Sequence, residues 1–170
     1  MTDNQKKKIL LVDDDPIIIS VLKTLLSSQY TVIEASNYKT AVQALHENDI
    51  SLAILDIFLD DDKSGLDVLL EIRRLNNMTP VIMLSNSSDL DTVIKCIKLG
   101  ACDYIPKGNL DDHNGLMIKI NNCFNKELTC RTIRSLEREF DHNHPVVFQS
   151  KAIQRILQEV ELLEDMNILI

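Results

Sequence analysis

The chain has 170 residues, enough for one domain of ordinary size with an appendage and too few for a multi-domain enzyme. Hydrophobic residues make up 45% and charged residues 26%, a balance that allows a buried core and excludes disorder by composition. The formal charge of -8 repels phosphate backbones and anionic lipid, so we expect this chain to bind neither nucleic acid nor membrane directly. The four cysteines lack zinc or disulfide spacing, and the first apolar run is too short for a signal peptide, so we expect a cytoplasmic protein.

Short apolar runs alternate with helical patterns from residue 9 onward. Such runs indicate buried strands, and we predict five of them, at 9–12, 30–35, 51–56, 80–84 and 103–106. The intervening patterns predict helices at 16–28, 39–47, 64–75 and 90–99. Apolar residues expected to face the core are Ile18, Val21, Leu22 and Leu25 in the first helix and Leu66, Leu69, Leu70 and Ile72 in the third. With right-handed crossovers, this order predicts an α/β fold with a doubly wound five-stranded parallel sheet, whose ligand site lies at the carboxyl ends of the strands.

From Asn109 the pattern becomes one long helix, which we expect to run to about Phe140 and to be broken between residues 141 and 145. Its apolar stripe consists of Leu116, Ile120, Phe124 and Leu128. A helix that outruns its domain often pairs with a copy of itself, so the stripe predicts a homodimer; the alternative is a terminal helix packed on the sheet, followed by a linker helix. The predicted organisation is a domain at 1–125, a helical linker at 126–145 and the start of a truncated output domain at 146–170.

Acidic residues follow the first and third predicted strands. Asp13 and Asp14 end the first strand and Asp56 ends the third, and these strands are neighbours in a doubly wound sheet. Carboxylates that converge in this way need a cation, and a set of oxygen ligands suits Mg²⁺. The triplet at residues 13–15 has a simpler alternative role, because negative charge at a helix N-terminus caps the helix.

A hydroxyl and an ammonium group complete this edge of the sheet. Ser85 follows the fourth predicted strand and Lys107 follows the fifth. With a bound metal, they form a site that can accept a phosphoryl group on a carboxylate, since Lys107 neutralises phosphoryl oxygens and Ser85 donates a hydrogen bond. Asp56 is the expected nucleophile because it stands alone on its strand, while Asp13 and Asp14 supply metal ligands.

Four segments, ILLVDDDP, LAILDIFL, PVIMLSNSSD and GACDYIPKG, resemble the receiver domain of two-component response regulators over residues 9 to about 125. The resemblance implies that Asp56 takes a phosphoryl group from a sensor histidine kinase or phosphotransfer protein. It also implies that Asp14 binds Mg²⁺ directly, Asp13 binds it through water, and the main-chain carbonyl of Phe58 completes the shell. Ser85 and Tyr104 become the switch pair: Ser85 moves toward the phosphoryl group and the Tyr104 ring turns inward. The implied role is a signalling switch, not an enzyme.

The sequence departs from the family pattern beside the site. Asn86 follows Ser85 where a small residue is usual, and Gly108 follows Lys107 in place of a proline. The loop FLDDDKSG after Asp56 lacks the usual proline, and its acidic run at residues 60–62 indicates a solvated loop. We expect Phe58 and Asn86 to flank the phosphoryl group and to slow the access of donors and of hydrolytic water.

The tail VVFQSKAIQRILQEVELLEDMNILI resembles the opening of the AAA+ ATPase domain of sigma-54-dependent activators, without a Walker A motif before Ile170. This resemblance implies an output through sigma-54 RNA polymerase by an ATPase domain that this sequence does not include; the alternative is an unrelated helix and strand. Two alternative functions also stay open. A phosphotransferase of the haloacid dehalogenase type would use Asp13 as nucleophile and Asp15 as acid, and a receiver-like binding module would never turn over phosphate.

Overall fold

The computed structural model describes residues 6–59, 62–75, 78–86, 90–110 and 112–143; at residue 130 and over 133–143 it describes the backbone alone. The chain divides into two units, Met1–Arg131 and Thr132–Ile170. The sheet belongs to the first unit, and most of the second lies outside the described residues, including the whole of the predicted output segment at 146–170.

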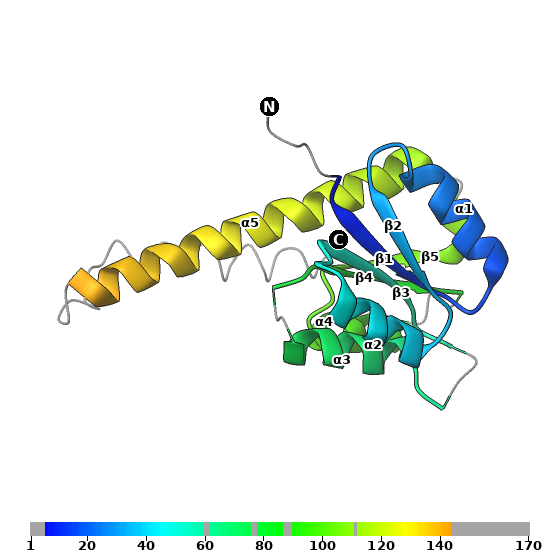
Figure 1. Cartoon of the computed structure of the whole chain (residues 1–170), viewed down its shortest axis with the longest axis horizontal. Helices are drawn as coiled ribbons and strands as arrows, with labels where there is room; N and C mark the ends of the chain where they lie inside the picture. The colour runs from blue at the N-terminus through cyan, green and yellow to red at the C-terminus, as the bar shows by residue number, and fades with distance from the viewer. Residues whose placement is uncertain (1–5, 60–61, 76–77, 87–89, 111, 144–170) are drawn as a thin grey trace. The chain divides into compact units, whose positions relative to one another are not determined.

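A five-stranded parallel sheet forms the centre of the first unit (Figure 1). Its strands are β1 (Lys8–Val12), β2 (Thr31–Ala35), β3 (Leu52–Asp56), β4 (Val81–Ser85) and β5 (Asp103–Pro106), in the order β2-β1-β3-β4-β5. The two inner strands β3 and β4 are buried at every position, and a strand buried on both faces has a continuous apolar sequence. The predicted α/β fold is therefore confirmed, with each strand end within one residue of its predicted place.

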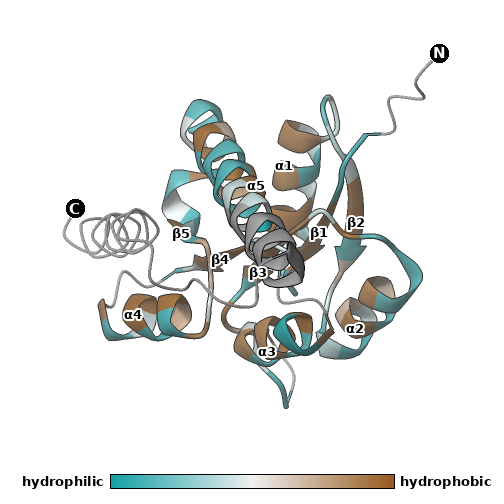
Figure 2. Ribbon diagram, turned by 90° about the vertical axis from the view of Figure 1, so that its left-hand side faces the viewer, coloured by the Kyte–Doolittle hydropathy of each residue, from teal (hydrophilic) through white to brown (hydrophobic). Residues whose placement is uncertain are grey.

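Helices cover both faces of the sheet. They are α1 (Pro16–Leu26), α2 (Tyr38–Glu47), α3 (Gly65–Leu75), α4 (Leu90–Lys98) and α5 (His113–Asn143). Figure 2 shows α1 and α5 on one face and α2, α3 and α4 on the other. The core has two matching halves: Leu22 and Ile120 pack with one set of strand side chains, and Ala41 and Leu69 pack with the other set.

Several predicted details of the helices are wrong. Val21 is 39% exposed and Leu70 is 49% exposed, whereas Leu26, which we did not predict to face inward, is fully buried. Periodicity locates the centre of an apolar face but not its width. The last helix starts at His113 and not at residue 109, because a 3-10 turn, η1 (Lys107–Asn109), intervenes, and it ends at Asn143.

The apolar stripe of α5 serves mainly to dock the helix on the sheet. Leu116, Ile120 and Phe124 are buried in the core on the α1 side, while Leu128 is 65% exposed. The Phe124 ring also packs 6.2 Å from the Tyr30 ring, and Lys7 Nζ lies 3.7 Å from its centre. Packing within the chain thus explains the first three positions of the stripe, and the homodimer stays a prediction.

Arg73 ties α3 to two neighbouring turns. Its Nη1 donates to the main-chain oxygen of Thr79 and its Nη2 to that of Gly100, both at 2.7 Å. Gly100 adopts a φ of 95° at the end of α4, and a Cβ there would lie 3.0 Å from Arg73 Nε. The two charge-assisted hydrogen bonds therefore fix the entrance to β4 and the turn into β5.

Candidate functional site

The strand register brings the predicted site residues to one edge of the sheet. Val12 of β1 is paired with Leu55 of β3, so Asp13 and Asp56 are the next residues of adjacent strands. Asp56 is in turn level with Leu84 of β4, which precedes Ser85. Ser85 is level with Pro106 of β5, which precedes Lys107. The carboxyl ends of four parallel strands therefore supply the two carboxylates, the hydroxyl and the ammonium, as the sequence predicted.

Lys107 bridges the two buried carboxylates. Its Nζ lies 2.8 Å from Asp13 Oδ2 and 2.9 Å from Asp56 Oδ2. The three side chains are 8%, 1% and 5% exposed, respectively, so these ion pairs are shielded from water. Asp14 is exposed at the rim, and one carboxylate oxygen from each of Asp13, Asp14 and Asp56 lies within 4.8 Å of the others.

The three consecutive acids have three different places. Asp15 caps α1, since its Oδ1 accepts a hydrogen bond of 2.8 Å from the main-chain N–H of Ile17. Asp13 turns inward, and its Oδ1 accepts a hydrogen bond of 2.9 Å from the N–H of Asp15. The capping role considered for the whole triplet therefore belongs to Asp15 alone.

Burial sets the electrostatics of this site. Desolvation raises the pKa of the Asp56 carboxyl, the hydrogen bond from Lys107 opposes that rise, and the charge of Asp13 adds to it. For Lys107, burial acts to lower the pKa, but its hydrogen bond to Asp56 and its ion pairs with Asp13 and Asp56 outweigh burial, and the pKa is raised. Lys107 therefore stays charged, and the surroundings of the Asp56 carboxyl disfavour its negative charge. Perturbed groups of this kind cluster at functional sites.

The donor set fits Mg²⁺. Asp13 Oδ2 is buried and accepts no hydrogen bond, although Lys107 Nζ is close enough for an ion pair. The cluster holds three carboxylates and Lys107 pairs with two of them, so negative charge remains for a divalent cation to balance. Mg²⁺ prefers oxygen ligands and retains several waters, which suits a cluster with one exposed member.

Gly65, which our sequence analysis overlooked, positions Asp56. A Cβ at Gly65 would lie 1.8 Å from the main-chain oxygen of Asp56 and 2.8 Å from its carbonyl carbon. The N–H of Gly65 donates to the main-chain oxygen of Ile57 at 3.0 Å. Asp67 Oδ2 fixes the same helix start by accepting from the N–H of Ser64 at 2.8 Å and from its hydroxyl at 2.9 Å. Helix α3 therefore begins directly against the backbone of Asp56, and a glycine at the start of a predicted helix was the only signal.

The other predicted residues lie at different depths. Ser85 is fully buried, and Tyr104 is half-buried against the core on the α2, α3 and α4 side. The Phe58 side chain is 62% exposed, while its main-chain N–H donates to the Asp56 carboxylate. Asn86 is exposed, and no atom lies within 4 Å of the Cβ position of Gly108. Metal binding by the Phe58 carbonyl stays a prediction, and residues 60–61 of the acidic run lie outside the described residues.

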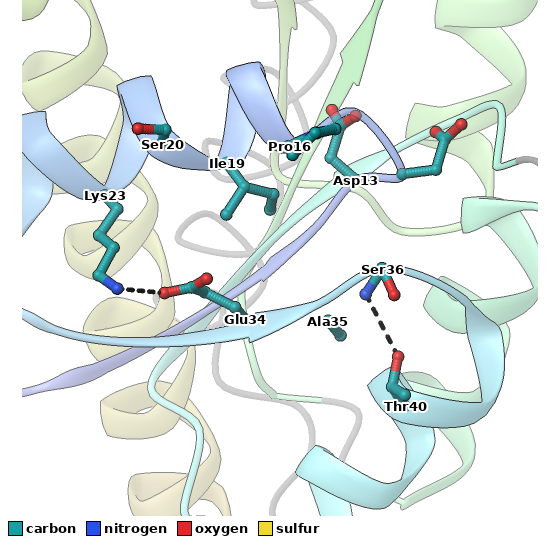
Figure 3. Close-up of a pocket in the computed structure, with 10 residues that line it drawn as sticks. Asp13, Pro16, Ile19, Ser20, Lys23, Glu34, Ala35, Ser36 and Thr40 are labelled. Atoms are coloured by element: carbon teal, nitrogen blue, oxygen red, sulfur yellow. Dashed lines mark hydrogen bonds and ion pairs between the residues drawn. The ribbon is translucent and has the colours of Figure 1, made fainter.

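A pocket of about 510 Å³ extends from Asp13 and Asp14 between α1, β2 and α2. Figure 3 shows the ion pair that crosses its wall, in which Lys23 Nζ lies 2.6 Å from Glu34 Oε1. On the α2 side, the N–H of Ser36 donates to Thr40 Oγ1 at 3.3 Å. The acids can therefore be reached from the α1 side of the sheet edge.

A doubly wound parallel sheet with acids, a hydroxyl and a lysine at its carboxyl edge defines the CheY-like receiver class. The chain matches the family model of the response regulator receiver domain over residues 9–121, and it belongs to that family. The haloacid dehalogenase alternative is therefore wrong, and the acid it required, Asp15, caps α1.

Relatives of known sequence and structure agree with this assignment. The chain is 38% identical over 103 residues to the transcriptional regulatory protein MalR of Bacillus subtilis, and the alignment covers 58% of this chain and 43% of MalR. It is 43% identical over 102 residues to the transcriptional regulatory protein CpxR of Escherichia coli, covering 59% of this chain and 42% of CpxR. The chain thus spans less than half the length of these curated relatives.

Solved structures show the same fold. A CheY-like receiver domain protein of Methanospirillum hungatei superposes with a TM-score of 0.67 at 26% identity, covering 74% of this chain and 98% of that one. NtrX of Brucella abortus, crystallised with ADP, gives a TM-score of 0.73 at 25% identity and covers 92% of this chain and 34% of NtrX. Within the described residues, no helix is both long and apolar enough to cross a membrane.

Proposed function

We propose that this receiver is a phosphorylation switch in which Asp56 accepts a phosphoryl group from a sensor histidine kinase or a phosphotransfer protein. The observation that supports the proposal is the bridge from Lys107 to Asp13 and Asp56, buried beside Ser85 at one edge of the sheet. A structural ion pair needs one carboxylate, whereas this lysine faces two, and an oxygen of a third, Asp14, lies within 4.8 Å of oxygens of those two.

The chain's own residues have distinct roles in the transfer. An Asp56 oxygen attacks phosphorus in line, the bond from phosphorus to the donor breaks, and the donor keeps its electron pair. Lys107 pairs with the oxygens of the transferred group, and the Ser85 hydroxyl donates a hydrogen bond to it. Asp13, Asp14, Asp56 and the Phe58 carbonyl would hold Mg²⁺, which when bound neutralises phosphoryl charge. Tyr104 then packs further inward, so that phosphorylation shifts an equilibrium between two surfaces of the domain.

The direct test treats the protein with acetyl phosphate and magnesium and measures the intact mass. We expect a gain of one phosphoryl group, mapped to Asp56 by borohydride reduction and abolished by Asp56→Asn. Asp49→Asn, a change at an exposed acid away from the site, is the matched control and should leave the gain intact. A label on Asp13 would contradict the proposal.

A receiver-like module that binds but never turns over phosphate needs a separate test. Beryllofluoride imitates a phosphoryl group on the aspartate, so with magnesium it should perturb the resonances of Tyr104. If Tyr104 does not respond and no phosphoryl group is gained, the binding-module alternative is the correct one.

The side chains of Phe58 and Asn86 beside the site predict slow phosphoryl transfer and slow hydrolysis. Phe58 and Asn86 are both exposed at the edge of the site, where they can obstruct donors and water. We expect Asn86→Ala to shorten the lifetime of phospho-Asp56, measured by loss of the phosphoryl group after the donor is removed. An unchanged lifetime would show that Asn86 does not shield the phosphoryl group.

For the output, we propose transcription regulation in the cytoplasm through a sigma-54-type ATPase domain. MalR and CpxR are named as transcriptional regulatory proteins, and the match to NtrX covers 92% of this chain, more than the receiver alone. A Walker A motif encoded shortly beyond Ile170 would support this output, and another kind of domain there would overturn it.

Light scattering with and without beryllofluoride tests the predicted homodimer, which a monomer in both states would refute.

A further inference from the structure

Two cysteines far apart in sequence meet between the start of β5 and the helix that covers it. Cys102 directly precedes β5, and Cys123 lies on α5. Both side chains pack in the core cluster that α1 and α5 cover, and the two thiols are close enough to interact with each other. Cys123 is 1% exposed within the core on the α1 and α5 side, and Cys102 is half-buried against the same cluster. Cys102 is therefore the more exposed residue of the two, and Cys123 is enclosed in the core.

The surroundings make the two thiols unequal. The hydrogen bond from Cys123 lowers the pKa of the Cys102 thiol, and the positive charges of Lys126 and Arg73 act in the same direction, against burial and the charge of Asp103. The same hydrogen bond and burial raise the pKa of the Cys123 thiol. A partly exposed thiol whose pKa is lowered, next to a second thiol, is the arrangement found in oxidisable cysteine pairs.

Cys96 provides an internal comparison. It lies on α4 with its side chain fully buried, and burial raises the pKa of its thiol. A buried thiol of that kind reacts poorly with an oxidant from solvent, so the first attack on peroxide should be confined to Cys102 among the cysteines whose side chains the structure describes.

We propose that Cys102 and Cys123 are an oxidisable pair, which a hydroperoxide converts to an intrachain disulfide between the start of β5 and α5. The Cys102 thiolate attacks one peroxide oxygen and the O–O bond breaks. The hydroxide that leaves takes up the proton lost by Cys102, which gives a sulfenic acid and water. The Cys123 sulfur then attacks the Cys102 sulfur, the S–O bond breaks, and hydroxide leaves with the Cys123 proton as a second water. The two thiols lose two electrons, and the peroxide gains them.

The disulfide would act on a part of the domain that already couples β5 to α5. Lys119 of α5 pairs with Asp103 of β5 at 2.8 Å, and the N–H of Tyr104 donates to the same Asp103 oxygen at 2.7 Å. A covalent bond one residue before Asp103 would make this contact permanent. Cys102 lies at the amino end of β5 and Asp56 at the carboxyl end of β3, so the pair and the phosphoacceptor lie at opposite edges of the parallel sheet.

The test uses the full chain, reduced, then exposed to hydrogen peroxide, alkylated and digested with trypsin. The sequence places the four cysteines in separate tryptic peptides, with Cys102 in residues 99–107 and Cys123 in residues 120–126. We expect these two peptides to appear joined, with the loss of two hydrogens, and to separate after reduction with dithiothreitol. Cys102→Ser should abolish the product, and Cys96→Ser should leave it unchanged.

Other results would overturn the proposal. All four cysteines could remain free thiols after treatment, or Cys102 could be oxidised to sulfinic acid without forming a crosslink. Cys102 could also form its crosslink with Cys130 or with a second chain. Treatment in urea is the control for geometry, because an unfolded chain should give mixed pairings in place of the single pair. A second measurement uses the melting temperature, which should rise on oxidation of the wild type and fall back on reduction, since the crosslink restricts the unfolded chain. Cys102→Ser should show no such rise.

Discussion

The contact between Gly65 and Asp56 gives the sharpest prediction about this fold. A Cβ at residue 65 would lie 1.8 Å from the Asp56 main-chain oxygen, whereas real Cβ atoms essentially never come closer than 3.0 Å to such an atom. The difference, 1.2 Å, has to come from separating the start of α3 from the end of β3. Both neighbours are backbone, and β3 is a fully buried inner strand, so neither can yield as a flexible side chain would.

We therefore expect Gly65→Ala to lower the free energy of unfolding by about 3 kcal/mol, at the upper end of the usual range for overpacking. The better helix propensity of alanine offsets less than about 1 kcal/mol, because residue 65 begins its helix. A loss of about 3 kcal/mol corresponds to a melting temperature roughly 10 °C lower for a domain of this size.

The assay is urea unfolding of the wild type and two alanine variants. Gly108→Ala is the matched control, since no atom lies within 4 Å of its Cβ position and its φ is not in the left-handed region. We expect this control to be as stable as the wild type or up to about 1 kcal/mol more stable. A Gly65→Ala protein within about 0.5 kcal/mol of the wild type, at an unchanged m-value, would refute the reasoning. Stability is the readout, so the outcome does not depend on the chemistry of the site.

Substitutions at three further residues test the electrostatics of the domain. Lys107→Met removes the hydrogen bond that lowers the pKa of Asp56, so carboxyl NMR without metal should show that pKa raised further. Relative to the wild type, the variant should lose stability as pH rises above the ordinary value of an aspartate carboxyl and through the raised one. An unchanged pKa would contradict the bridge. Asp67→Ala should lower the free energy of unfolding by about 1 kcal/mol at neutral pH. Hydrogen bonds from Ser64 lower the pKa of the Asp67 carboxyl, so the difference from the wild type should vanish as pH falls below the ordinary aspartate value and through the lowered one. A deficit that persists in acid would argue against capping of α3 by Asp67. Arg73→Met should lower the free energy of unfolding in urea by roughly 2–3 kcal/mol and speed hydrogen exchange in the turn into β5. Arg73→Lys should recover little of this stability, because an ammonium lacks the guanidinium fork. Full recovery by lysine would show that charge alone suffices.

Local sequence patterns predict much of this fold because its strands are parallel and buried. Each inner strand is an uninterrupted apolar run ending in a polar residue, as at Asp56 and Ser85, so the runs locate both the strands and the site. The neighbouring positions of β1 and β3 in a doubly wound sheet then bring Asp13 and Asp56 together before any coordinates are known.

The features that the sequence did not predict depend on contacts between distant segments. Gly65 matters because of the Asp56 backbone, and the spacing of Cys102 and Cys123 contains no sign that α5 returns across the start of β5. The burial of a side chain cannot be read from periodicity either, since Val21 and Leu128 fit an apolar period and yet face solvent. Periodicity describes one element, whereas burial depends on what packs against it.

The register of the sheet also constrains when the site can exist along the folding pathway. Asp13, Asp56, Ser85 and Lys107 are supplied by four strands, and each becomes adjacent to the next only when its strand has paired. Parallel pairings of this kind join segments distant in the chain and form late relative to local helices. A chain that lacks any one of these pairings lacks part of the phosphoacceptor site. Competence to accept a phosphoryl group should therefore appear only as the sheet is completed, so that phosphorylation reports on the integrity of the fold.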